Sequence, residues 1–140
     1  MADLKAFFAQ NQVKQENIKF VISKRFLDEQ GKPIEWELRA LDTEESEAIK
    51  KECTRRVKVG GNRFAVEVDE DKMGGKMAAA CVVYPDLNDA ALQDSYKVMG
   101  ADQLLKKMLS MGEYATLAKK ITELNGLNES MDDLVEEAKN

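Results

Sequence analysis

The sequence predicts an α+β fold, in which an N-terminal β-hairpin region packs with a mainly helical C-terminal half in a single compact domain. Apolar and polar residues alternate along residues 18–40, as in strands that bury one face. In the second half, leucine and methionine recur at the spacing of one helix face. The length of 140 residues suits one domain.

We divide this domain into four segments, and no internal repeat or low-complexity stretch separates them. They are a short helix and connector (1–15), a hairpin, helix and strand-like region (16–68), a helical region (69–126), and a terminal helix with an acidic tail (127–140). The chain opens on a predicted amphipathic helix, because Leu4, Phe7 and Phe8 lie at positions i, i+3 and i+4 and Asp3 is placed to cap it.

A β-hairpin is predicted over residues 19–41. Two alternating apolar sets mark its strands: Ile18, Phe20 and Ile22, then Ile34, Trp36, Leu38 and Ala40. The polar loop 28–33 between them contains Gly31 and Pro33. Because an isolated hairpin is marginally stable, we expect its apolar face to pack on helices.

Capping residues mark the next elements. Asp42 and Glu45 form a capping-box pattern before a helix that we expect to end near Arg56. Residues 57–68 are strand-like, but Gly60–Gly61 interrupts them, which indicates a second hairpin or a mobile loop.

The chain is predicted to be helical from Asp69 onward. The first of these helices ends at Pro85 and carries Met73, Met77, Ala80, Cys81 and Tyr84 at helical spacing. The later ones span residues 88–96, 101–110, 113–125 and 129–138. Gly100 and Gly112 separate neighbouring helices, and Gly126 is placed as a helix stop.

The composition excludes much chemistry. The chain has no histidine and only two separated cysteines, so it lacks the residues of Ser-His-Asp catalysis and of most zinc sites. We therefore expect no enzyme activity, and reduced thiols at Cys53 and Cys81. No apolar run is long enough to span a bilayer.

Metal and phosphate motifs are incomplete. Residues 69–74 place acids at positions 1 and 3 of a calcium loop, but Met73 and Ala80 stand where oxygen ligands are needed. We interpret the acids as a helix N-terminus, which favours negative charge. Gly60–Gly61 and Gly74–Gly75 lack the phosphate-loop pattern, so we expect no cofactor and no metal.

A basic stretch runs from Lys50 to Arg63, with six basic residues against one acid. We interpret it as a helix C-terminus that continues into a solvated loop, since basic residues suit that end of the helix dipole. An acidic protein partner is the functional alternative. A nucleic-acid-binding regulator is a further hypothesis, but Phe64 is the only aromatic residue nearby.

The seven methionines suggest a partner-binding surface, because methionine adapts to varied apolar partners. Met99, Met108 and Met111 lie between Tyr96 and Tyr114 in sequence, near two glycine breaks, and this segment is a candidate apolar groove. Our candidate partner-binding residues are Tyr84, Tyr96, Met99, Leu105, Met108 and Tyr114. The alternative is that these side chains simply fill the core.

The stretch VYPDLNDAALQDSY (83–96) is distinctive, as are VMGA (98–101), LLKKML (104–109), MGEY (111–114) and LNG (124–126). LKAFFAQN (4–11), VISKRF (21–26), GKPIEW (31–36) and KECT (51–54) add to the pattern. Together they resemble the XkdN-like tail assembly chaperones of phages and defective prophages of Gram-positive bacteria. One departure is Lys97, where the family pattern has Gly.

The resemblance implies a non-catalytic chaperone that binds the tape-measure protein, keeps it soluble and leaves before the particle is complete. The tail-tube protein is a second candidate partner, and the expected location is the host bacterial cytoplasm. We expect neither a nucleic-acid nor a membrane partner, while the apolar stripes are compatible with a homo-oligomer. The alternative function is a small structural tail adaptor or completion protein of the virion.

Overall fold

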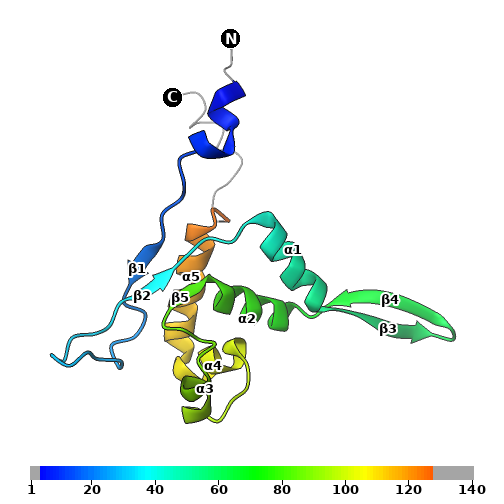
Figure 1. The fold of residues 1–140 in the computed structure, drawn as a ribbon. Helices are drawn as coiled ribbons and strands as arrows, with labels where there is room; N and C mark the ends of the chain where they lie inside the picture. Colours follow the sequence, from blue (N-terminus) through cyan, green and yellow to red (C-terminus); the bar gives the residue numbers. More distant parts are fainter. Residues whose placement is uncertain (1–3, 128–140) are drawn as a thin grey trace.

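The computed structural model describes residues 4–127. A three-stranded antiparallel sheet, in the order β1-β2-β5, lies at the centre of the molecule (Figure 1). Its strands are β1 (Ile18–Phe20), β2 (Trp36–Leu38) and β5 (Val82–Tyr84). The helices are α1 (Thr43–Glu52), α2 (Glu70–Cys81), α3 (Ala90–Ser95), α4 (Ala101–Met108) and α5 (Met111–Leu124). This architecture confirms the predicted α+β class.

The predicted hairpin is confirmed by the pairing of β1 with β2. Ile18 lies opposite Leu38, and Phe20 lies opposite Trp36. Alternation sets the burial of β2, because Trp36 and Leu38 are fully buried while Glu37 between them is partly exposed. In the connecting loop, the Asp28 carboxylate accepts hydrogen bonds from two backbone N–H groups, at 2.9 Å each.

The prediction that one helix runs from Asp69 to Pro85 is wrong at its end. Helix α2 stops at Cys81, and the chain continues as strand β5, which pairs with β2 through Leu38 opposite Val82. Two consecutive β-branched valines favour the strand, and the free edge of β2 supplies the backbone partners. Tyr84 therefore lies on a strand.

The capping box at Asp42 is confirmed: the backbone N–H of Glu45 donates to Asp42 at 2.8 Å, and the Asp42 N–H donates back at 3.2 Å. The expected end near Arg56 is wrong. Helix α1 ends at Glu52, and Arg55 and Arg56 already belong to a strand. Tertiary pairing decides this, because residues 54–58 find partners in residues 64–68.

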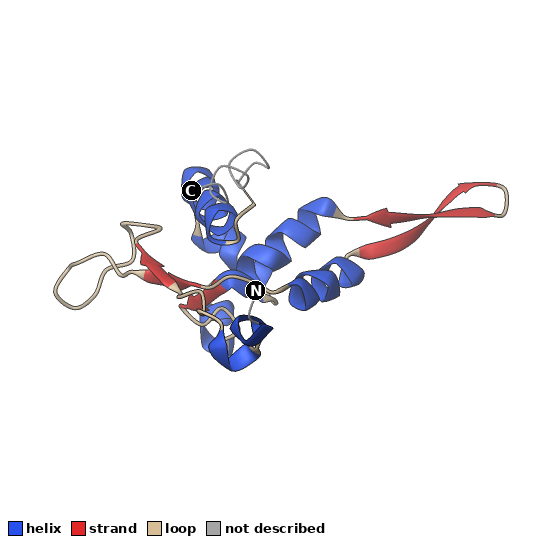
Figure 2. Cartoon of the chain, turned by 90° about the horizontal axis from the view of Figure 1, so that it is seen from above, coloured by secondary structure: helices blue, strands red, loops and turns tan. Residues whose placement is uncertain are grey.

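A projecting two-stranded arm takes the place of the solvated loop expected from the basic stretch. In the described part of the chain, strands β3 (Thr54–Gly60) and β4 (Arg63–Val68) pair with each other only, and their ribbon extends away from the helices (Figures 1 and 2). The second-hairpin interpretation of residues 57–68 is confirmed, with Gly60 and Gly61 at positive φ in the turn. We call residues 54–68 the arm.

Two helix starts differ from the prediction. Helix α3 begins later than the predicted start at residue 88, because Asp89 caps it by accepting from the Leu92 N–H at 2.8 Å. Gly112 does not break the chain, because Ser110 and Glu113 form a capping box that places Gly112 in the first turn of α5. Gly100 at φ +114° precedes α4, and Gly126 at φ +72° follows α5, both as expected from glycine.

The N-terminal amphipathic helix is replaced by two short 3-10 helices, Leu4–Phe7 and Ala9–Asn11. Leu4 and Phe7 are 70% and 78% exposed, so no packing offsets the cost of nucleating an α-helix. The predicted Asp3 cap and the predicted helix at 129–138 lie outside the described residues.

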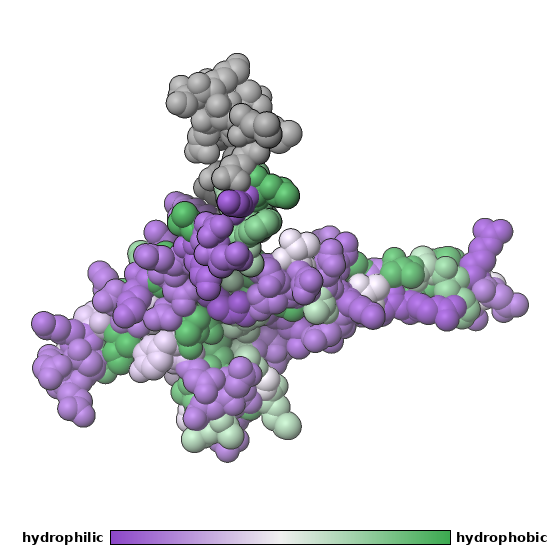
Figure 3. Space-filling model, turned by 45° about the horizontal axis from the view of Figure 1, so that its top comes forward, coloured by the Kyte–Doolittle hydropathy of each residue, from purple (hydrophilic) through white to green (hydrophobic). Residues whose placement is uncertain are grey.

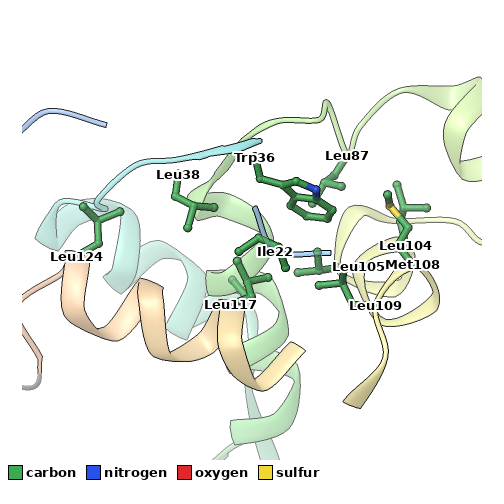
Figure 4. Packing of buried hydrophobic residues seen from close by; sticks show 11 residues of the cluster. Ile22, Trp36, Leu38, Leu87, Leu104, Leu105, Met108, Leu109, Leu117 and Leu124 are labelled. Carbon is green, nitrogen blue, oxygen red and sulfur yellow. The ribbon is translucent and has the colours of Figure 1, made fainter. Parts of the chain in front are cut away.

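The core forms where the sheet, α2, α4 and α5 meet (Figure 4). Side chains from β2, α4 and α5 converge there, and the most buried are Trp36, Leu38, Leu104, Leu105 and Leu117. Helix α2 approaches α4 closely at Gly75, where an added Cβ would meet Lys106 Cε at 3.5 Å. Within residues 4–127, no helix combines the length and apolar character needed to cross a membrane.

Candidate partner-binding surface

An apolar pocket of about 180 Å³ opens on the surface beside the central sheet. Its wall is almost entirely apolar, and seven residues from four parts of the chain form it: Phe26, Ile34, Trp36, Tyr84, Pro85, Leu92 and Met108. Trp36 is 1% exposed and Met108 is 5% exposed, so they form the floor. Tyr84 is 54% exposed and lies on the rim.

The loop between β1 and β2 supplies one wall of the pocket. The Ile34 N–H donates to the Phe26 carbonyl at 2.9 Å, and a β-bridge joins Leu27 to Pro33. These contacts fold the loop back on itself, which brings Phe26 and Ile34 beside Trp36. Tyr84 and Pro85, at the end of β5, also line the pocket.

Arg25 fixes this wall to the helices. Its guanidinium donates to the Glu113 carboxylate and, at 2.6 Å, to the Met108 carbonyl. The hydrogen bonds from Arg25 and from the Ser110 backbone hold the pKa of Glu113 well below its ordinary value. The residue next to Phe26 is thereby tied to the junction of α4 and α5.

The structure separates the six predicted site residues. Tyr84 and Met108 both line the pocket. Leu105 is fully buried in the core, beneath the surface. The remaining three do not line the pocket: Tyr96 and Tyr114 pack half-buried against the core, and Met99 is 93% exposed.

In the structure, the three methionines of the candidate groove do not lie together. Met108 points into the core with Leu104 and Leu105, because these residues share one face of α4. Met99 and Met111 are 93% and 90% exposed, so they do not line a shared hollow with it. The capping box at Ser110 also removes the second of the two expected breaks.

Sequence reasoning missed Phe26, Ile34, Trp36, Pro85 and Leu92 as pocket residues. Alternation marked Ile34 and Trp36 as buried, but it cannot say which buried residues border an opening. Leu92 lies four residues before Tyr96, a spacing that indicates one helix face. The spacing does not tell which other elements that face contacts. The pocket arises only because β2, β5, α3 and α4 meet.

The cysteines and the acidic residues of the described chain do not form a ligand site. Cys53 and Cys81 are buried free thiols, and burial raises the pKa of Cys81. Asp69 accepts from the Lys72 N–H at 3.1 Å, so the 69–71 acids mark a helix start, as predicted. Among residues 4–127, no three His, Cys, Asp or Glu side chains gather in a metal-binding arrangement.

A family comparison accounts for the whole described chain. The model of the phage XkdN-like tail assembly chaperone proteins matches residues 4–139. The chain belongs to this family. The XkdN-like family is one of phage tail assembly chaperones, so the resemblance noted in the sequence is confirmed.

Relatives in Bacillus subtilis (strain 168) extend over nearly the full length. The phage-like element PBSX protein XkdN is 34% identical and covers 99% of this chain and 94% of its own length. The uncharacterized protein YqbN is 32% identical, with coverages of 99% and 93%. A crystal structure of YqbN has a TM-score of 0.77 at 28% identity and covers 90% of this chain and 98% of that one.

Proposed function

We propose that this XkdN-like chain binds the phage tape-measure protein and keeps it soluble while the tail is assembled. It acts without catalysis in the host bacterial cytoplasm and leaves before the particle is complete. The tail-tube protein is a second partner in this proposal. The observation that carries the proposal is the apolar pocket with Tyr84 on its rim.

A tape-measure protein exposes long apolar helical faces before the tube encloses it. Helix-in-groove recognition covers such faces by seating spaced apolar side chains in pockets. A small pocket takes one anchor side chain at a time, so each contact is weak and the complex remains reversible. A rim tyrosine suits this role, because it offers apolar area and a hydroxyl at low entropic cost.

The test is co-expression of the tagged chain with the long coiled-coil-rich protein encoded just downstream of its gene. We expect the partner to become soluble and to co-elute. Tyr84→Glu places a charge at the mouth of the pocket, and we expect it to weaken capture about tenfold or more. Because Tyr84 is 54% exposed, we expect the variant to keep its fold, and its thermal melt checks this.

Met99→Glu is the matched control, since Met99 is 93% exposed and does not line the pocket. Equal loss of capture in both variants would contradict the pocket assignment. Partner insolubility with the wild-type chain would contradict the function itself.

Mass spectrometry of purified particles separates the chaperone from a structural adaptor of the tail. The chaperone proposal expects the chain in assembling lysates and not in mature particles. A stoichiometric signal in mature particles would assign the chain to the virion.

A further inference from the structure

The arm presents a mixed basic and apolar surface that is separate from the pocket. Arg56 lies opposite Val66 and Lys58 lies opposite Phe64, so these four side chains share one face of the hairpin. All four are exposed, with Phe64 at 53% and Val66 at 71%. The Arg56 guanidinium lies 4.5 Å from the centre of the Phe64 ring. We call these four residues the arm face.

The arm has features of a surface that binds a partner. A two-stranded hairpin without a supporting layer is marginally stable in water. Among residues 4–127, both of its outer edges carry unpaired backbone groups, because β3 and β4 bond only to each other. Figure 3 shows apolar and hydrophilic side chains together along its length, with no other part of the described chain over the face in view.

Charge indicates what that partner is. The arm carries four basic residues and one acid, a net charge of +3, while the chain as a whole carries −5. The rest of the chain therefore carries −8. Residues 128–140 are strongly acidic, with five acids against Lys139 alone. Met131, Leu134 and Val135 interleave with those acids, so the segment combines negative and apolar side chains as the arm face combines positive and apolar ones.

We propose that the arm face of one copy binds residues 128–140 of a second copy. Arg56 and Lys58 pair with the acids, and Phe64 and Val66 contact the interleaved apolar side chains. A second copy is favoured over the same chain because the arm extends away from the end of α5, where residues 128–140 begin (Figures 1 and 2). The exchange is reciprocal, so two arms and two acidic segments join one symmetric dimer.

Sedimentation of the full chain tests the proposal. We expect a monomer–dimer equilibrium between micromolar and hundreds of micromolar protein. Raising the salt from about 0.05 M to about 0.5 M is expected to weaken the dimer about tenfold, because exposed charges are screened. Sedimentation as a monomer throughout at low salt would overturn the proposal.

Charge reversal locates the two surfaces. R56E/K58E on the arm and D132K/D133K on the segment are each expected to weaken the dimer about tenfold or more. An equimolar mixture of the two variants is expected to restore it, because the acids introduced on one copy's arm then meet the lysines introduced on the other copy's segment, while the unchanged basic arm meets the unchanged acidic segment. Loss without restoration in the mixture would assign the arm to another surface and overturn the proposal.

The control K14E/K32E makes the same change in charge at two exposed positions outside the arm, and the dimer is expected to persist. If the control weakens the dimer as much as R56E/K58E does, net charge alone explains the effect and the proposal is overturned. Duplex DNA binding that R56E/K58E abolishes, in a chain that stays monomeric, would assign the face to nucleic acid. None of these outcomes depends on capture of the tape-measure protein, which is tested through Tyr84.

Discussion

Met108 shows, at the scale of one residue, how burial changes the meaning of a candidate contact. It lines the floor of the pocket but is only 5% exposed, and it packs with Leu104, Leu105 and Leu109 in the core. Met108 shapes the binding surface, but a substitution there would also disturb the core. Tyr84 on the rim is the better probe of binding.

We expect Met108→Lys to lower the free energy of unfolding by about 3 kcal/mol or more, because an unpaired charge would be buried among apolar side chains. Met99→Lys, at a position 93% exposed, is expected to change it by less than about 0.5 kcal/mol. Urea unfolding followed by circular dichroism measures both. Equal stabilities would show that Met108 is not part of the core.

The Arg25–Glu113 pair makes stability depend on pH. Because its folded-state pKa is lowered, the ionised Glu113 carboxylate stabilises the native state at neutral pH. That contribution is present above the ordinary glutamate pKa of about 4.3 and is lost as the pH falls through the folded value. The hydrogen bond from Arg39 likewise lowers the pKa of Glu45, to about 2, so its carboxylate contributes to stability over a similar pH range.

Glu113→Gln isolates this contribution, since glutamine keeps the capping geometry without the charge. The wild type is expected to melt above the variant at pH 7, and the gap is expected to narrow below about pH 4. Thermal melts from pH 7 down to about pH 2 measure the gap. A gap that does not change with pH would mean that the charge of Glu113 plays no part.

The arm is the element whose role is most separable from the core. Its residues beyond the base do not join the buried cluster, and the arm contains no fully buried side chain. The sequence already marked it by strand propensity around Gly60–Gly61. That it would project alone was not predictable, because propensity says nothing about which neighbours a strand lacks.

Replacing residues 56–66 with Asn-Gly shortens the arm to a two-residue turn between Arg55 and Glu67, which lie opposite each other. We expect the melting temperature of the monomer to change by no more than about 4 °C. Differential scanning calorimetry at low protein concentration measures it, so that self-association does not contribute. Loss of a cooperative transition would show that the arm supports the core.

At the scale of the whole molecule, one small domain carries two surfaces of different chemistry. The pocket is apolar and lies beside the central sheet, whereas the arm face is basic and apolar and projects into solvent. We propose the first as the site for the tape-measure protein and the second as the site for a second copy. In this proposal each dimer presents two pockets, which multiplies weak contacts along a long partner.

Local signals in the sequence determined most of the elements. The capping residues Asp42 and Asp69 fixed where two helices begin, and the alternation around Trp36 fixed the hairpin and its buried face. The family was also readable from sequence, through the stretch from Tyr84 to Tyr114. These features depend on neighbours within a few positions, so the chain itself contains the information.

The tertiary structure alone decided what depends on distant partners. Residues 82–84 became a strand because the edge of β2 was free to pair with them. The pocket exists because Phe26, Trp36, Tyr84 and Met108 converge from separate elements. Such convergence depends on contacts between residues far apart in sequence, which local periodicity does not encode.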